Sequence, residues 1–343
     1  MSSRPTIKDL ADAAGVSIAT VDRVLNSRTK VREATAQRVL LAAEEIGYHA
    51  AGLLKRRLRE TRPRKTLVVL LQRSSDAFYR ALGDSIQRMS RNFSRFALET
   101  RIHFMDEVSP EYIVAELQNK TLDADAVVLV ALDHHMVNLA VDQLNADGKI
   151  VLTLLSPLSA SGCNGHIGLD SHSAGRCAAW SISRLCPRPG KVGILLGSHR
   201  YRNQEISEIS FIRYLRERAP DFVLLPSLLN LDDERLAAEA TAQLLDDHPD
   251  LVAIYNAGGG VDGVIRAVRR ERHSRRLVVI CNELTTNNRT ALAEGLLDVI
   301  IATPLDKLAS ELHTMLDQAL NARPDVRFPP VYLPVDLHIS ENV

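Results

Sequence analysis

The sequence predicts a small all-helical head followed by a larger, bilobed α/β body that contains two mostly parallel sheets. Three observations support this expectation. The first fifty residues show helical periodicity on both sides of a glycine turn. From residue 66 onward, unbroken Val/Ile/Leu runs alternate with helical stretches, as strands buried on both faces of parallel sheets do. These runs form two series within 343 residues, which indicates two lobes.

Composition places the chain among ordinary globular proteins. Hydrophobic residues make up 45% and charged residues 24% of the chain. No run of 18 apolar residues could span a membrane, and the N-terminus lacks the apolar stretch of a secretory leader. The four cysteines form no CxxC pair. We therefore expect a cytoplasmic protein with no membrane partner, no cofactor and no metal.

The charges are unevenly divided, although the formal net charge is zero. Residues 1–65 contain 14 Lys/Arg and 7 Asp/Glu, so this segment carries +7 and the remainder −7. Seven of those basic residues fall within 49–65, against the single acid Glu60. A basic head on an acidic body suits a small domain that contacts phosphates, and a solvated charged linker would have the same composition.

Three helices are expected in the head. Thr6 can cap the first, and Gly15 ends it because a tight turn favours a residue that tolerates positive φ. Ser17 can cap the second, and a third over about 34–46 ends at Gly47. This spacing is typical of a helix-turn-helix, whose second helix enters the DNA major groove, although any small three-helix bundle shares part of it.

The run TIKDLADAAGVSIATVDRVLNSRTKVREATAQRVLLAAEEIGY resembles the headpiece of the lactose-repressor (LacI/GalR) family of bacterial transcription regulators. The resemblance implies binding to a double-stranded DNA operator. It puts Ile18, Ala19 and Arg23 at base-reading positions, and arginine is the commonest bidentate reader of guanine. A phosphate contact is the alternative for Arg23. The positions that would face phosphates or the DNA backbone are Thr6, Ser17, Thr20 and Asn26.

Residue 22 departs from the family, which usually has serine there; here it is Asp22. A carboxylate near DNA can accept from a cytosine amino group, pair with a neighbouring arginine or point away. We expect Asp22, still counted with the DNA-binding positions, to pair with Arg23.

The segment 49–65 also departs from the family. In the family, a Pro-Asn pair follows the tyrosine, and a leucine nine residues after the tyrosine wedges into the minor groove of the DNA. Here Ala50 replaces the proline, and Arg57 stands nine residues after Tyr48. Three alternatives stay open. The helix could be shifted so that Leu54 or Leu58 is the wedge. It could bind mostly by charge, with Lys55 and Arg57 contacting phosphates. The segment could also be no more than a basic linker.

The body resembles the sugar-binding periplasmic proteins of type I, the usual partner of this headpiece. The resemblance implies a ligand held between two lobes and three chain crossings, which we place near 167–170, 303–304 and 332–334. The expected domains are a headpiece over 1–48, a hinge or linker over 49–65, and a body over 66–343, with its N-lobe at 66–168 and 304–332 and its C-lobe at 169–303 and 333–343.

Ligands of such folds bind beyond the carboxyl ends of the strands, so the residues after each strand are the candidate effector contacts. After the first strand, Asp76, Phe78 and Tyr79 match a carboxylate and an aromatic pair that would hold a sugar's hydroxyls and apolar face. Glu283 stands where the family has a ligand-chelating aspartate. The other candidates are Ser156, Arg202, Asn203, Glu205, Asn256, Asn282 and Thr303. After the fourth strand, Leu155 and Ser156 replace the family's Asp-Arg pair, so its chelating arginine is missing.

The resemblance implies a homodimeric regulator, a repressor by family habit, that responds to a small polyhydroxylated effector such as a sugar or cyclitol. Asp76 and Glu283 should face each other, and two acceptor-only groups need a donor-rich polyol or a cation. We expect a neutral polyol, with Arg202 as the one basic side chain placed near it.

Two alternatives remain. The missing arginine motivates a body that responds to a protein or a phosphorylated partner. The other alternative is an enzyme that processes sugars or nucleosides. The sequence contains no GxSxG, HExxH or Walker motif, which argues against this alternative.

Overall fold

The computed structural model describes residues 5–26, 31–54, 62–91, 93, 95–271 and 276–343. The chain divides into two compact units. The first comprises residues 1–65 and 93–99, and the second comprises residues 66–92 and 100–343.

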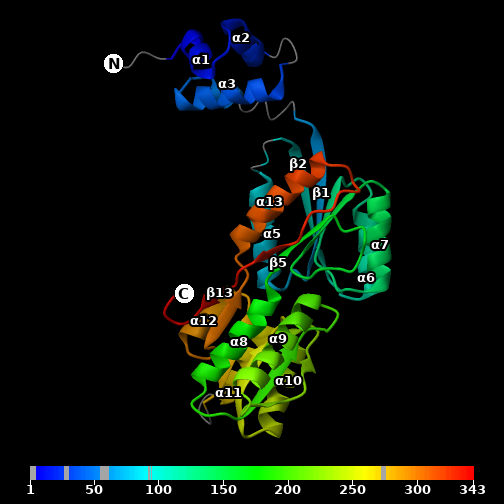
Figure 1. The fold of residues 1–343 in the computed structure, drawn as a ribbon, viewed down its shortest axis with the longest axis vertical. Coiled ribbons are helices and arrows are strands. Elements are labelled where there is room, and N and C mark those ends of the chain that lie inside the picture. The colour runs from blue at the N-terminus through cyan, green and yellow to red at the C-terminus, as the bar shows by residue number, and fades with distance from the viewer. Residues whose placement is uncertain (1–4, 27–30, 55–61, 92, 94, 272–275) are drawn as a thin grey trace. The chain divides into compact units, whose positions relative to one another are not determined.

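The first unit contains a three-helix bundle, α1 (Ile7–Ala14), α2 (Ile18–Asn26) and α3 (Glu33–Glu45) (Figure 1). Thr6 caps α1 in a reciprocal capping box with Asp9, and Gly15 ends the helix at φ 61°. These local signals set the turn between α1 and α2. The buried core of the bundle is formed by Leu10, Ala11, Ala14, Val21, Val24, Ala36, Val39, Leu40, Ala42, Ala43, Tyr48 and Leu54.

The second unit contains two sheets. The first has the order β12-β5-β4-β3-β1-β2, and its pairs from β12 to β1 are parallel. Its strands are β1 (Arg64–Gln72), β2 (Ala97–Met105), β3 (Ala126–Leu129), β4 (Ile150–Leu154), β5 (Gly165–Leu169) and β12 (Val331–Leu333).

Helices cover both faces of this sheet because its strands are apolar on both sides. Val68 and Leu70 belong to the cluster that includes residues of α6 (Pro110–Lys120) and α7 (His135–Ala146). The other face packs against α5 (Ala77–Ser90) and α13 (Leu305–Asn321), which contact each other (Figure 1).

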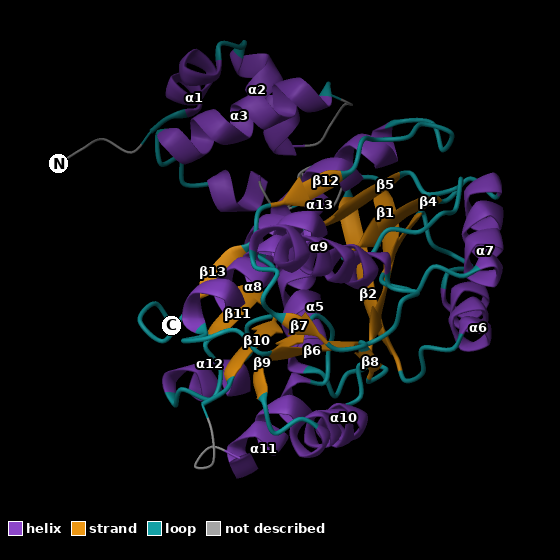
Figure 2. Cartoon of the chain, turned by 60° about the horizontal axis from the view of Figure 1, so that its bottom comes forward, coloured by secondary structure: helices purple, strands orange, loops and turns teal. Residues whose placement is uncertain are grey.

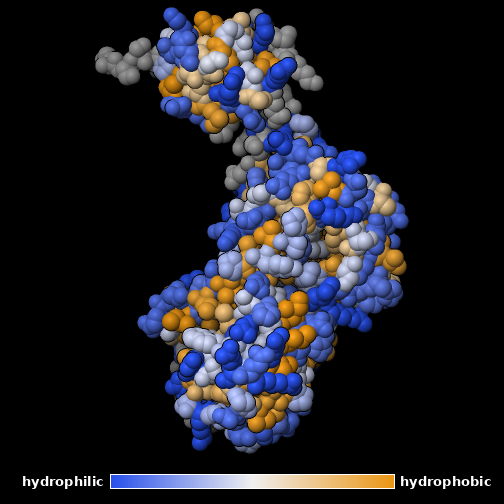
Figure 3. All heavy atoms as spheres, in the orientation of Figure 1, coloured by the Kyte–Doolittle hydropathy of each residue, from blue (hydrophilic) through white to orange (hydrophobic). Residues whose placement is uncertain are grey.

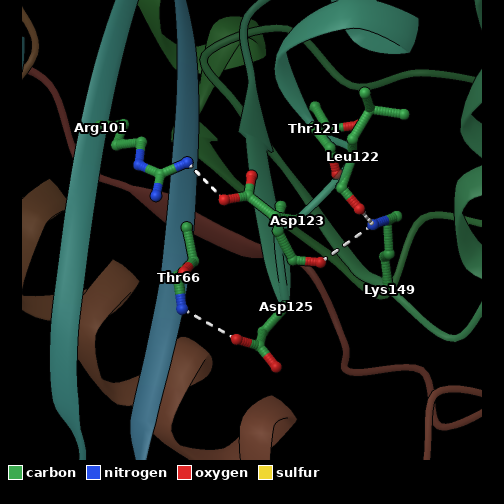
Figure 4. Close-up of polar contacts among 8 residues, drawn as sticks. Thr66, Arg101, Thr121, Leu122, Asp123, Asp125 and Lys149 are labelled. Carbon is green, nitrogen blue, oxygen red and sulfur yellow. Dashed lines mark hydrogen bonds and ion pairs between the residues drawn. The ribbon is translucent and has the colours of Figure 1, made fainter.

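Polar contacts link β1 and the edge strand β2 to the segments that precede β3 and β4 (Figure 4). Thr66 N donates to Asp125 Oδ2 at 2.8 Å, and Arg101 Nη1 to Asp123 Oδ2 at 2.7 Å. Lys149 Nζ donates to three backbone carbonyls at 2.8–3.1 Å. These bonds occupy the end of the sheet opposite to the one where ligands of such folds bind.

The second sheet has the order β13-β11-β10-β9-β6-β7, with β8 also paired to β6. All its pairs are parallel except β11 with β13. Its strands are β6 (Lys191–Leu196), β7 (Val223–Leu224), β8 (Leu228–Leu229), β9 (Leu251–Asn256), β10 (Val278–Asn282), β11 (Val299–Ala302) and β13 (Asp336–His338).

Helices again lie on both faces, as Figure 2 shows. Ile254 belongs to the cluster that includes α10 (Glu234–Asp247), α11 (Val261–Glu271) and α12 (Thr286–Ala293). Its neighbour Tyr255 points to the opposite face. There it stacks at 4.9 Å on Phe211 of α9 (Arg202–Arg218), which packs against α8 (Ser171–Leu185).

The chain passes between the two sheets three times: after β5, after β11, and between β12 and β13. The predicted fold class is therefore confirmed. None of the described helices is long and apolar enough to cross a membrane. The face drawn in Figure 3 is a mixture of hydrophilic and hydrophobic residues.

Candidate functional site

The candidate DNA-contacting face of the head lies on α2. Ile18, Ala19 and Arg23 are exposed there, and Ile18 keeps 48% of its surface open although it is apolar. Ser17 Oγ accepts from Thr20 N at 3.2 Å and therefore caps the helix. The helix thus presents one exposed face that joins an apolar and a basic side chain.

Asp22 corrects one expectation. It was expected to pair with Arg23, but its Oδ1 accepts from Asn26 Nδ2 at 2.7 Å. Residues four apart lie on the same helix face, whereas adjacent residues point about 100° apart. This bond leaves Arg23 apart from the carboxylate and engages the amide of Asn26.

Leu54 corrects a second expectation. Its side chain is 1% exposed and belongs to the core of the head. A side chain that completes a core is not available as a wedge between base pairs in this conformation. The other residues expected to contact DNA from the basic segment, Lys55, Arg57 and Leu58, lie outside the described residues.

A cavity of about 440 Å³ lies where the strands of both sheets end. Its volume is within the range of small-molecule sites. The segments that follow β1, β4, β6, β8, β9, β10 and β11 all contribute to its wall. Eight sequence candidates lie in that wall: Asp76, Phe78, Tyr79, Ser156, Asn203, Asn282, Glu283 and Thr303.

Three candidates do not line the cavity, and this corrects their expected placement. Arg202 Nη1 bonds to Ser159 Oγ at 3.0 Å and lies 3.7 Å from Asp133 Oδ2. Asn256 is buried and donates to the carbonyl oxygens of Gly258 and Gly259 at 3.0 Å, so it shapes the glycine turn instead. Glu205, like Arg202, is on the first turn of α9 and lies outside the wall.

The first edge of the site is the start of α5. Asp76 caps this helix, and its Oδ1 accepts from Phe78 N at 2.8 Å. Burial raises the pKa of the Asp76 carboxyl, partly offset by the bond from Phe78 N. Phe78 and Tyr79 meet edge to face at 5.3 Å. The wall therefore joins a carboxylate to an aromatic pair.

Glu283 follows β10 and adopts a left-handed backbone at φ 64°, which is uncommon outside glycine. Its carboxylate accepts from Thr303 N at 2.9 Å and Thr303 Oγ1 at 2.7 Å. Burial raises the pKa of Glu283 to about 7, and the charge of Asp76 adds to the increase. Glu283 thus joins the cavity to Thr303, where the chain crosses between the lobes.

Asp232 is a wall residue that the sequence analysis missed. It has φ 52° and accepts from Gly259 N and, at 3.3 Å, from Gln204 Nε2. Burial raises the pKa of its carboxyl. It follows the two-residue strand β8, whose length gives no periodic signal. The other missed polar wall residues include Gln72, Arg73, Ser75, Arg80, Ser171, Tyr201, Gln204, Ser207, Asp233, Glu234, Asp262, Thr285, Asn287 and Asn288.

Four buried polar atoms in the wall have no hydrogen-bond partner within the described part of the chain: Oγ of Ser156 and Oδ1 of Asn203, Asn282 and Asn288. Ser156 and Asn288 are the most buried of these residues, at 1% and 2% exposed. Buried polar atoms are usually satisfied, so a bound molecule or water is expected to serve them.

Contacts between the two lobes surround the cavity. Gln72 Nε2 on β1 donates to Tyr201 Oη at 2.6 Å. Asp133 N donates to Arg200 O at 2.8 Å, and Arg73 lies 3.6 Å from Asp233. These bonds hold residues 200–202 against the first lobe, which is the physical reason that Arg202 points away from the cavity.

The raised pKa of Glu283 gives a pH-dependent stability. Its value of about 7 lies above the ordinary 4.5, so between these pH values the folded state holds a proton that the unfolded chain has lost. The contribution of protonated Glu283 to the free energy of unfolding is complete below pH 4.5 and is lost as the pH rises through 7. Its size is on the order of 3 kcal/mol. Urea unfolding at several pH values should show this loss, and Glu283→Gln should remove it; equal pH profiles for the two proteins would contradict the assignment.

Comparison with known proteins agrees with this architecture. The periplasmic binding protein domain family matches residues 67–324, and the lacI family of bacterial regulatory proteins matches residues 6–50. GalS of Salmonella typhimurium, a helix-turn-helix-type transcriptional regulator, is 26% identical over 215 residues, 62% of this chain and 60% of GalS. GalR of Escherichia coli is 26% identical over 202 residues, 58% of this chain and 55% of GalR. The chain thus spans a little over half the length of these relatives.

Solved structures share the fold of the body. The glucose-galactose binding protein GanP of Geobacillus stearothermophilus superposes with a TM-score of 0.73 at 13% identity, over 82% of this chain and 99% of GanP. For a LacI-type regulator of Bacteroides fragilis, the TM-score is 0.70 at 22% identity, over 81% of this chain and 98% of that one.

The two sheets, the three crossings and the cavity at the strand ends define a body of the periplasmic-binding-protein class. The head that precedes it has the helices and caps of a helix-turn-helix. The chain belongs to the periplasmic binding protein domain family, and its head is a lacI-type helix-turn-helix domain.

Among the described residues, no group of three or more His, Cys, Asp or Glu side chains is arranged to hold a metal ion.

Proposed function

We propose that the chain is a sequence-specific DNA-binding transcription regulator whose affinity for its operator is set by a small polyhydroxylated effector. The observation that carries this proposal is the presence, in one chain, of an exposed recognition helix and a ligand-sized cavity between two lobes. The relatives GalS and GalR are named as transcriptional regulators, which supports the same function.

The wall of the cavity suits a polyol. Carboxylates accept from hydroxyl groups and amides also donate to them, and the ring of Tyr79 lies in the wall, where it can pack on the apolar side of a sugar. We propose the wall candidates Asp76, Phe78, Tyr79, Ser156, Asn203, Asn282, Glu283 and Thr303, together with Asp232, as the effector contacts.

Effector binding would act by favouring one lobe arrangement. A ligand that contacts both lobes binds one arrangement better and therefore shifts its population. The bonds that Tyr201 Oη and the Arg200 carbonyl oxygen accept from the first lobe are the contacts that such a shift would break or keep. We propose a cytoplasmic homodimer acting as a repressor, whose two heads read the half-sites of a near-palindromic operator.

A thermal-shift screen of sugars, sugar acids and cyclitols tests the effector half of the proposal. A ligand at 100 times its Kd adds roughly 2.7 kcal/mol of stability. Stabilisation by such a compound is the expected result. If no compound stabilises the chain while a protein or phosphorylated partner does, the body responds to that partner instead. Turnover of a stabilising compound would show an enzyme.

Arg23→Ala tests the DNA half. On an operator selected from random DNA, the variant should bind about 1–3 kcal/mol more weakly and lose preference at one base pair in each half-site. Arg38, an exposed arginine on α3, is the matched control, and its replacement by alanine should leave base preference unchanged. An equal loss of affinity for operator and random DNA in the Arg23→Ala variant would make Arg23 a phosphate contact only.

A further inference from the structure

The wall of the cavity is strongly acidic. The described wall residues include two arginines, Arg73 and Arg80, and neither a lysine nor a histidine. Against these two cations stand six carboxylic side chains, Asp76, Asp232, Asp233, Glu234, Asp262 and Glu283. The sequence analysis expected Arg202 near the ligand, but this guanidinium lies outside the wall, whereas the unanticipated Asp232 lies within it.

Both arginines are engaged by protein groups. Arg73 Nη1 lies 3.6 Å from Asp233 Oδ2, and Arg80 Nη1 donates to the carbonyl oxygen of Ser74. The three most enclosed carboxyl groups, Asp76, Asp232 and Glu283, form no ion pair with any residue that the structure describes. They are held instead by neutral donors from backbone amides, Thr303 and Gln204.

These three carboxyl groups come from both lobes and line the same cavity as the aromatic ring of Tyr79. Burial raises the pKa of the Tyr79 hydroxyl, and the nearby groups of Asp232, Tyr201, Asp76 and Glu283 add to the increase. Carboxylates around the face of an aromatic ring are the environment that binds an ammonium group, through ion pairs and a cation–π contact.

A neutral polyol would supply no counter-charge to these carboxyl groups, whose pKa values burial raises because ionisation is costly in the cavity. Unpaired buried carboxylates are costly, and closing two lobes brings charges of the same sign together. A ligand cation offsets this cost, while its hydroxyl groups can still serve the unpartnered oxygens of Ser156 and Asn288. The same charges disfavour a phosphorylated or carboxylated ligand.

We propose that the effector is a polyol that carries a protonated amino group, of the amino-sugar or aminocyclitol class, with the ammonium seated between Asp76, Asp232 and Glu283 beside Tyr79. This inference rests on the proposed function and narrows its ligand class.

Calorimetry on the full chain with matched pairs tests the ligand class. Glucosamine is compared with glucose, galactosamine with galactose, and N-acetylglucosamine serves as the uncharged amide of the first pair. We expect at least one free amine to bind about tenfold or more tightly than its neutral counterparts. A neutral sugar that binds as tightly as its amine, or more tightly, would overturn this inference and leave the proposed regulator intact. If none of these sugars or amines binds and no cyclitol stabilises the chain in the thermal-shift screen, the proposed polyol effector fails as well.

Two neutralising variants test the seat of the ammonium group. Asp232→Asn and Asp76→Asn keep the shape of the side chains, and each should reduce the amine preference by about tenfold. Asp246→Asn, an exposed acid on α10 outside the cavity, should leave the preference unchanged. Thermal melting without ligand shows whether each variant folds. If Asp232→Asn and Asp76→Asn both fold and both keep the full amine preference, these acids do not seat the ammonium group.

Discussion

Replacing Glu283 with alanine should weaken effector binding by about 2 kcal/mol or more, roughly 30-fold in Kd. The change removes a carboxylate that Thr303 N and Oγ1 hold in the cavity wall, at 2.9 and 2.7 Å. A ligand would then lose a charged acceptor, and the cavity would lose its bond to the lobe crossing. The measurement is the thermal shift produced by a compound that stabilises the wild-type chain.

Glu205→Ala is the matched control for this variant. Glu205 was a sequence candidate for the same ligand, but it does not line the cavity, so its loss should leave the thermal shift intact. A different outcome would contradict the account. If Glu283→Ala unfolds cooperatively at a much lower temperature and still shows the full ligand-induced shift, Glu283 has a structural role only.

Gly175→Ala should destabilise the body by about 3 kcal/mol or more. An added Cβ on Gly175 would lie 2.0 Å from the Ser207 carbonyl oxygen and 3.0 Å from Phe211 N. Both atoms belong to the backbone, as does the Ser207 carbonyl carbon at 2.8 Å, so α8 and α9 would have to separate. That separation would displace Ser207 and Gln204 in the cavity wall and should also weaken effector binding.

Urea unfolding measures this effect, with Gly83→Ala as the control. Gly83 is also in a helix of the body, but its added Cβ would meet only side chains, the nearest at 3.4 Å. That change should be neutral or stabilise by about 0.5–1 kcal/mol, because alanine favours a helix. Equal stabilities of the two variants would show that α8 and α9 are not packed as closely as described.

The sequence predicted those parts of the fold that depend on local signals. The N-cap at Thr6 and the turn at Gly15 are indicated by the residue types at those positions, and both occur in the structure. The buried strands are likewise visible as apolar runs. The two-residue strand β8 left no such signal, and Asp232 after it was missed for that reason.

Side-chain direction was harder to predict than position along the chain. Arg202 stands after β6, as expected, yet Asp133 and Ser159 of the other lobe draw it away from the cavity. Asp22 pairs along its helix with Asn26, and Asn256 turns toward the backbone of the glycine loop. Tertiary packing or the rotation of the helix determines each of these partners. The spacing of residue types along the sequence does not reveal either.

The central claim is that the cavity and the recognition helix are coupled within one chain. The direct test measures the affinity of the full chain for its selected operator, first without ligand and then with a saturating concentration of a compound shown to bind the body. We predict a change of about 5- to 150-fold in operator affinity, the usual range of such coupling. An operator affinity that is the same with the cavity empty and saturated would contradict the account.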